Sequence, residues 1–131
     1  MRGQQHERGA AVVEFALIVP ILLMLVLGIA EFGRAYYLQT TISMAARDGV
    51  RVMAVQNNQP AARAAAKTAA QGLSPALTDG QISVIPTSCA ATGVTPPGTA
   101  TVTVSYPMDF ITGFFGADIT LTGKGTMRCN G

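Results

Sequence analysis

The feature that most limits the fold of this chain is an apolar run from Ala10 to Ala30, interrupted by one charge, Glu14. About 21 helical residues at about 1.5 Å each span roughly 30 Å, the hydrocarbon thickness of a bilayer. The sequence after the run, EFGRAYY, lacks the small-residue cleavage pattern of a secretory signal peptide. We therefore interpret residues 10–30 as a retained transmembrane helix, preceded by a short polar leader, residues 1–9.

The helical pattern continues beyond the apolar run. Small and apolar residues recur with helical spacing in one stripe: Ile42, Ala45, Ala46, Gly49, Val50 and Met53. This spacing predicts one helix from about Ala10 to Val55, with residues 31–56 forming an amphipathic continuation. Pro20 predicts a local kink because proline removes a backbone donor and clashes with the preceding turn. Tyr36 and Tyr37 are suited to a membrane–water interface.

Residues 57–131 are predicted to form a small α+β domain. Pro60 and an alanine-rich stretch closed by Gly72 indicate a short second helix, whose small-residue face could dock or lie exposed. Period-two alternation then predicts about three antiparallel strands covered by the amphipathic helix. The expected inward residues are Ile82, Val84, Val102, Val104, Tyr106, Ile119 and Leu121. Gly123 and Gly125 suggest a bulge or turn.

The two cysteines, Cys89 and Cys129, are too few and too far apart for a zinc site. A disulfide is the natural interpretation if this half of the chain lies outside the cytoplasm. Closing a loop of about 40 residues would stabilise the fold by roughly 4 kcal/mol in the chain-entropy model. The alternative is a pair of unpaired core thiols.

The sequence offers no catalytic set, and neither a cofactor nor a metal site is expected. Its one histidine, His6, lies in the leader, and the acidic residues of the domain are well separated. There is no phosphate-binding loop, and the net charge of +2 comes without a basic run, which argues against nucleic-acid binding. Three phenylalanines and a methionine lie close together in sequence and are here called the aromatic cluster: Met108, Phe110, Phe114 and Phe115. This cluster is expected either to pack in the core or to form an exposed patch.

Glu14 is the anomaly of the apolar run. A carboxylate costs up to about 3 kcal/mol at the bilayer centre and less near an edge. Because Glu14 lies one turn from the start of the run, its side chain could simply reach the interface. Alternatively, cleavage after Gly9 would give Ala10 a free amine four residues away on the same helix face. Glu14 would then have a cationic partner, either its own terminus or that of a neighbouring copy.

Gly9 followed by AAVVEF resembles a type IV prepilin N-terminus, with cleavage after the glycine, glutamate as the fifth mature residue and then Phe15. Residues 8–51 resemble the TadE-like family of minor pilins. The shared features are the VEFAL-x-x-P opening at Val13–Pro20, the G-x-x-E-F-G-R exit at Gly28–Arg34 and the helix end at Ala45–Arg51.

This resemblance implies a pilin-like structural subunit of a Tad/Flp pilus system, not an enzyme. A prepilin peptidase would cut between Gly9 and Ala10, and an assembly platform would extract the mature chain. Glu14 and Phe15 would register it against other pilin subunits. The resemblance places the protein in the inner membrane as a single-pass protein, with a cytoplasmic N-terminus and an extracytoplasmic domain, and allows for incorporation into an extracellular pilus.

The alternative is an unprocessed bitopic membrane protein. Its extracytoplasmic domain would bind a ligand or partner through the Pro/Gly-rich loop at residues 87–98 or through the aromatic cluster.

Overall fold

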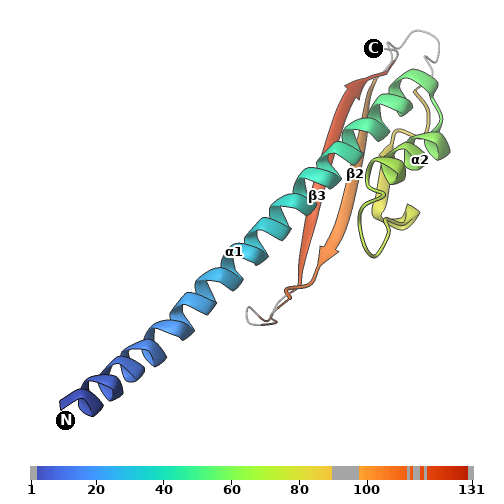
Figure 1. Cartoon of the computed structure of the whole chain (residues 1–131). Coiled ribbons are helices and arrows are strands. Elements are labelled where there is room, and N and C mark those ends of the chain that lie inside the picture. The colour runs from blue at the N-terminus through green and yellow to red at the C-terminus, as the bar shows by residue number, and fades with distance from the viewer. Residues whose placement is uncertain (1–2, 90–97, 112, 114–115, 117, 130–131) are drawn as a thin grey trace. The chain divides into compact units, whose positions relative to one another are not determined.

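The computed structural model describes residues 3–89, 98–111, 113, 116 and 118–129, with side chains from Glu7 onward (Figure 1). Along the chain lie α1 (Gly3–Gln56), α2 (Gln59–Ala69), a 3-10 turn η1 (Asp79–Gln81), β1 (Ile82–Ile85), β2 (Thr99–Met108) and β3 (Ile119–Arg128). The predicted α+β class, with a long helix, a short helix and three antiparallel strands, is confirmed. The chain forms two compact units, Met1–Arg34 and Ala35–Gly131.

Helix α1 begins at Gly3, seven residues before the predicted start at Ala10, and ends at Gln56. The expected leader therefore continues the helix, because Gln, Glu and Arg favour helix and no proline precedes Pro20. The helix runs through Pro20 without interruption. The kink expected at Pro20 stays a prediction.

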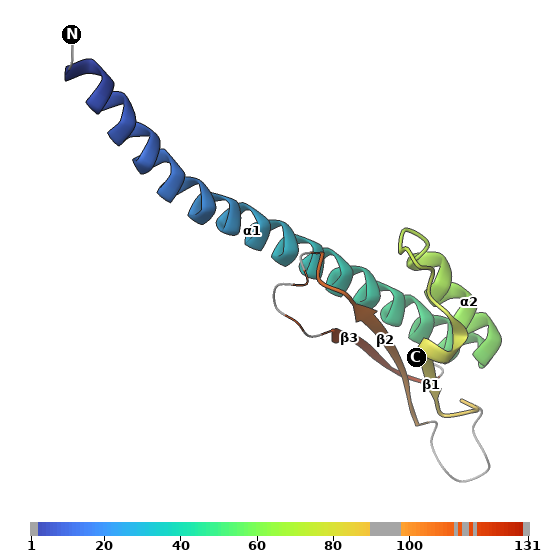
Figure 2. The same ribbon diagram turned by 90° about the horizontal axis from the view of Figure 1, so that it is seen from below.

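In the second unit, the C-terminal part of α1 packs on one face of the sheet (Figure 2). The whole predicted stripe, from Ile42 to Met53, is buried. Helix α2 docks beside it through Ala62 and Ala66, which resolves the choice left open by the sequence. At this contact a Cβ added to Gly49 would lie 3.2 Å from the carbonyl oxygen of Ala62, so small residues let the two helices approach closely.

The sheet has the order β1-β2-β3, and both pairs are antiparallel. The predicted inward residues of β1 and β2 are buried: Ile82, Val84, Val102, Val104 and Tyr106. The Tyr106 hydroxyl donates a hydrogen bond to the carbonyl of Pro75 at 2.8 Å, which satisfies its polar end inside the core. Met108 is also buried, and Phe110 packs against the core, whereas Phe114 and Phe115 lie outside the described residues.

The bulge or turn predicted at Gly123 and Gly125 is wrong. Strand β3 pairs with β2 without a break from Met108↔Ile119 to Thr99↔Arg128. A Cβ added to Gly123 would lie 2.6 Å from the carbonyl oxygen of Ile42, and one added to Gly125 would lie 2.7 Å from that of Ala46. The two glycines are thus required because the backbones of β3 and α1 touch.

The inward placement predicted for the start of β3 is only partly correct. Leu121 is half-buried and packs against the core, but Ile119 is 37% exposed. Ile119 opens the strand and pairs with the last residue of β2, Met108, so it lies at the end of the sheet.

We predict that Gly123→Ala and Gly125→Ala each destabilise the fold by about 1–3 kcal/mol, because a methyl group must displace helix backbone. Thermal unfolding of the full chain in detergent, followed by circular dichroism, measures the change. Gly80→Ala is the matched control, since a Cβ there meets nothing within 4 Å. Equal melting temperatures for all three variants would contradict close backbone packing.

Candidate assembly segment and disulfide-linked domain

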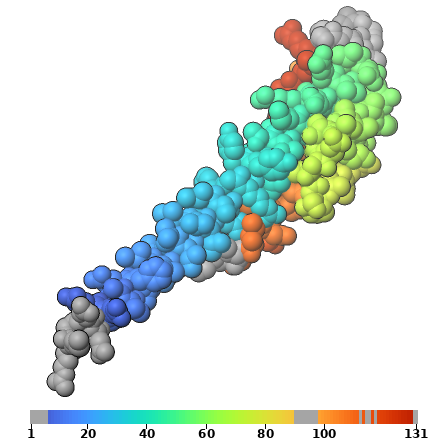
Figure 3. Space-filling model, in the orientation of Figure 1, coloured from blue at the N-terminus to red at the C-terminus, as the bar shows by residue number. Residues whose placement is uncertain are grey.

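The N-terminal unit exposes a continuous apolar surface. Large apolar side chains from Val12 to Ile29 have exposed fractions of 47–69%. The side chains of this helix form the blue part of the surface in Figure 3. The helix is long and apolar enough to cross a membrane by length and composition. A water-exposed surface of this size is unfavourable at about 25 cal/mol per Å² of apolar area, so lipid or another protein must cover it.

The predicted processing and assembly residues all lie on the exposed surface of this one helix. Gly9 and Ala10 are exposed, and a Cβ added to Gly9 would meet nothing within 4 Å. Glu14 is exposed, and Phe15 is 69% exposed. Because α1 is continuous here, Ala10 and Glu14 stand one turn apart on the same face. The helix thus brings together the positions that the sequence singled out.

Aromatic residues at the start of the second unit are also exposed. Tyr36 is 73% and Tyr37 is 54% exposed, as expected for side chains near an interface. Their backbone carbonyls accept hydrogen bonds from Thr40, and that of Tyr37 also accepts one from Thr41. The hydroxyls of Thr40 and Thr41 therefore donate to the helix backbone, and they can lie close to apolar surroundings without being unpaired donors.

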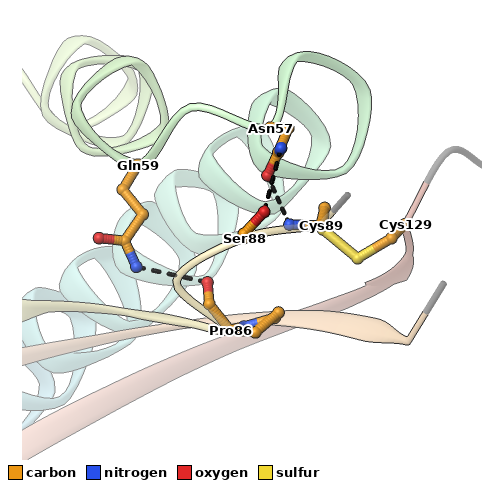
Figure 4. Close-up of a disulfide and its surroundings, with 6 residues drawn as sticks. All are labelled: Asn57, Gln59, Pro86, Ser88, Cys89 and Cys129. Atoms are coloured by element: carbon orange, nitrogen blue, oxygen red, sulfur yellow. Dashed lines mark hydrogen bonds between the residues drawn. A yellow bond between two sulfur atoms is a disulfide. The ribbon is translucent and has the colours of Figure 1, made fainter. Parts of the chain in front are cut away.

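The second unit is closed by a disulfide between Cys89 and Cys129, with Cα atoms 5.3 Å apart (Figure 4). The predicted pairing is confirmed, and the alternative of two free thiols is excluded. The bond joins the segment after β1 to the residue that follows β3. Beside it, the backbone N–H of Cys129 donates to the carbonyl of Gly98 at 2.9 Å.

Asn57 ties the end of α1 to this disulfide. Its backbone has a φ of +50°, a left-handed conformation that asparagine tolerates and that ends the helix. Its amide oxygen accepts a hydrogen bond from the backbone N–H of Cys89, and its amide nitrogen donates to Ser88 Oγ at 3.2 Å (Figure 4). Next to it, Asn58 Oδ1 accepts from the N–H of Ala61 and caps α2.

Gln59 adds a second tie between the helices and the sheet. Its Nε2 donates to the carbonyl of Val84 at 3.0 Å. It also donates to the carbonyl of Pro86 at 3.3 Å (Figure 4). These roles of Asn57 and Gln59 were not expected from the sequence. The sequence Asn-Asn-Gln between two helices could have indicated capping side chains, but their partners depend on tertiary contacts that a local pattern does not contain.

One surface ion pair links α2 to η1. Lys67 Nζ lies 2.8 Å from Asp79 Oδ1, and the hydrogen bond from Lys67 lowers the pKa of Asp79 below its ordinary value. Its stabilising effect is present above the ordinary pKa of aspartate and is lost as the pH falls through the lowered pKa. Both side chains are exposed, so the contribution is small. Among the described residues, no group of three or more His, Cys, Asp or Glu residues could hold a metal ion.

We predict that Asn57→Ala destabilises the fold more than Asn57→Gly does. Both variants lose the hydrogen bonds to residues 88 and 89, at a cost of about 1 kcal/mol or more. Glycine keeps the positive φ, whereas alanine adds a further strain of about 1 kcal/mol. Urea unfolding of the full chain under non-reducing conditions gives both values. Equal stability of the two variants would contradict the role of the left-handed conformation.

Comparison with known proteins supports the N-terminal assignment. A family model described as TadE-like protein matches residues 9–51. The matched segment contains Gly9, Glu14, Pro20 and the buried stripe up to Val50. Neither a curated protein nor a solved structure matches the chain. The matched segment and the exposed apolar helix fit a membrane-anchored Tad pilus subunit. The resemblance seen in the sequence is therefore confirmed for residues 9–51, which match the TadE-like family model.

Proposed function

We propose that this chain is a pilin-like structural subunit of a Tad/Flp-type pilus assembly system, processed after Gly9 by a prepilin peptidase and assembled through its N-terminal helix. One observation carries the proposal. The exposed apolar part of α1 lies within the segment that matches the TadE-like family model, and this segment also contains Gly9 and Glu14. A helix with no apolar partner of its own in the N-terminal unit is suited to lipid first and to other subunits later.

The chemistry of Glu14 supports processing. A carboxylate in an apolar environment is stabilised by a cation, and the chain has no basic residue between Arg8 and Arg34. Cleavage after Gly9 would create an amine at Ala10, one helical turn from Glu14. The new positive charge could pair with Glu14 of the same copy or of a neighbour. In the second case, each added subunit would be registered against the previous one, on an assembly platform that extracts subunits from the membrane.

The disulfide supports the proposed location of the second unit. Disulfides persist in the bacterial periplasm and outside the cell, whereas cytosolic thiols are kept reduced. The bond between Cys89 and Cys129 thus favours an extracytoplasmic domain. The N-terminus then lies in the cytoplasm, where the prepilin peptidase would meet Gly9. The helix would anchor the protein in the inner membrane as a single pass.

The alternative is an unprocessed bitopic protein with a binding domain, and it depends on different residues of the chain. It requires neither Gly9 nor Glu14, and it places function in the extracytoplasmic surface. Part of the aromatic cluster suggested for that surface is not available, because Met108 is 1% exposed and Phe110 packs against the core. The processing site is therefore the feature that separates the two hypotheses.

We predict that the full chain, co-produced with a prepilin peptidase, is recovered as a mature protein beginning at Ala10. Intact-mass spectrometry detects the loss of residues 1–9. Gly9→Ala should abolish cleavage. Gly28→Ala is the control, because this glycine lies in the same helix and a Cβ there also meets nothing within 4 Å. A chain that keeps residues 1–9 beside a peptidase active on another prepilin would disprove processing.

We predict that Glu14→Gln leaves membrane insertion intact and lowers incorporation of the subunit into assembled pili by about tenfold or more, as expected for loss of a charge-assisted hydrogen bond. Membrane fractionation and quantitative immunoblotting of sheared pili give the two values. Glu7→Gln is the control, since Glu7 would leave with the leader. Wild-type incorporation of the Glu14→Gln protein would contradict the registering role.

A further inference from the structure

The two edges of the sheet differ in how far they are protected. Strand β1 forms one edge, has only four residues and is covered by side chains of α2. Gln59 Nε2 donates to the carbonyl of Val84 at 3.0 Å, and Arg63 Nε donates to that of Ile82 at 3.4 Å. Short length and side-chain cover are the usual devices that prevent an edge from pairing with another strand.

Strand β3 forms the other edge, away from α2, and extends over ten residues (Figure 1). The carbonyl of Thr122 points away from β2 and is covered by α1, because it accepts a hydrogen bond from Gln39 Nε2 at 2.9 Å. In an antiparallel strand every second residue presents its N–H and C=O on the same side, so Lys124 and Thr126 also face outward. In the part of the chain that the structure describes, no strand pairs with this side of β3.

A groove of about 490 Å³ lies beside the outer part of β3, between that strand and α1. Its walls carry Arg47 and Arg51 from the helix and Lys124 from the strand, against one acid, Asp48. All four side chains are exposed. None of them belongs to an ion pair among residues 7–89, 98–111, 113, 116 and 118–129. The groove is therefore positively charged, and unpaired backbone groups lie next to it.

We propose that the outer edge of β3 binds an extended acidic segment of a partner protein, which adds to the sheet as a fourth strand. Its backbone would pair with Lys124 and Thr126. Its carboxylates would lie in the groove against Arg47 and Arg51, where guanidinium groups bind carboxylates with two parallel hydrogen bonds. Main-chain pairing would supply affinity, and the charges would select the sequence.

The charges also argue against a second copy of this chain at the same edge. Pairing two β3 strands would bring Lys124 and Arg128 of one copy close to the same groups of the other, and like charges on neighbouring strands are destabilising. A lysine on an exposed edge protects it from strands of like charge but favours an acidic one. This inference goes beyond the proposed function, because it involves neither the processing site nor the apolar run at residues 10–30.

Fluorescence anisotropy with the full chain in a neutral detergent tests the proposal. The probe is a labelled peptide of about ten residues, with glutamate alternating with threonine and valine. We expect it to bind at least about tenfold more tightly than the same peptide with lysine for glutamate, and to weaken with added salt. In Arg47→Glu/Arg51→Glu protein the preference should reverse.

Backbone pairing is tested separately from charge. Thr126→Pro removes one outward N–H, which edge strands tolerate, and should weaken binding by about tenfold, whereas Thr126→Val should not. Circular dichroism confirms that each variant is folded. The acidic peptide with N-methyl groups on alternate amides keeps its charge but cannot pair, and should lose binding by a similar factor.

Three results would overturn the proposal. The first is equal binding of the N-methylated and unmodified acidic peptides, which would indicate a simple anion site. The second is no binding of the acidic peptide by folded wild-type protein. The third is self-association of the full chain that Thr126→Pro abolishes, which would assign the edge to a second copy.

Discussion

The structure depends on one constraint: the first half of a long helix has an apolar surface that its own unit does not cover. Large apolar side chains from Val12 to Ile29 are roughly half to two-thirds exposed. They all belong to one continuous helix. Burial of apolar area is the main favourable term in folding, so such a segment requires an external partner. Lipid can cover this apolar surface without any specific arrangement of side chains. We propose that neighbouring helices replace lipid during assembly and that Glu14, the acidic residue inside the run, fixes their register.

In the second half of the same helix the apolar surface is buried, because other residues of the second unit cover it. This contact combines large buried side chains, such as Ile42 and Met53, with close approach of the backbones. Gly123 and Gly125 let β3 touch the backbone of α1. Gly49 leaves room for α2, because a Cβ there would lie only 3.2 Å from the carbonyl oxygen of Ala62. At the far end, the disulfide and Asn57 hold the helix terminus against the segment after β1. The disulfide thereby gives a small core the covalent support that small domains often need.

Periodicity predicted most of this fold correctly. The stripe from Ile42 to Met53 and the alternation in β1 and β2 are carried by local spacing, and both are confirmed. Gly123 and Gly125 were misinterpreted, because a glycine in a strand indicates equally a bulge or a close backbone contact, and only the position of α1 decides. The roles of Asn57 and Gln59 could not be predicted, since their partners lie 25 to 32 residues away. For the candidate assembly segment, the proposed residues, Gly9, Ala10, Glu14 and Phe15, lie close together in sequence, so motif and helix spacing suffice to propose a site.

The central claim is that residues 10–30 are anchored in a membrane while the second unit lies outside the cytoplasm. Protease treatment of right-side-out membrane vesicles from cells that produce the chain tests it most directly, with the mass of the protected fragment as the readout. We expect one protected fragment that contains the apolar run and ends near Arg34, where the second unit begins. A chain that is fully degraded, or a second unit that is protected until the vesicles are opened, would contradict this topology.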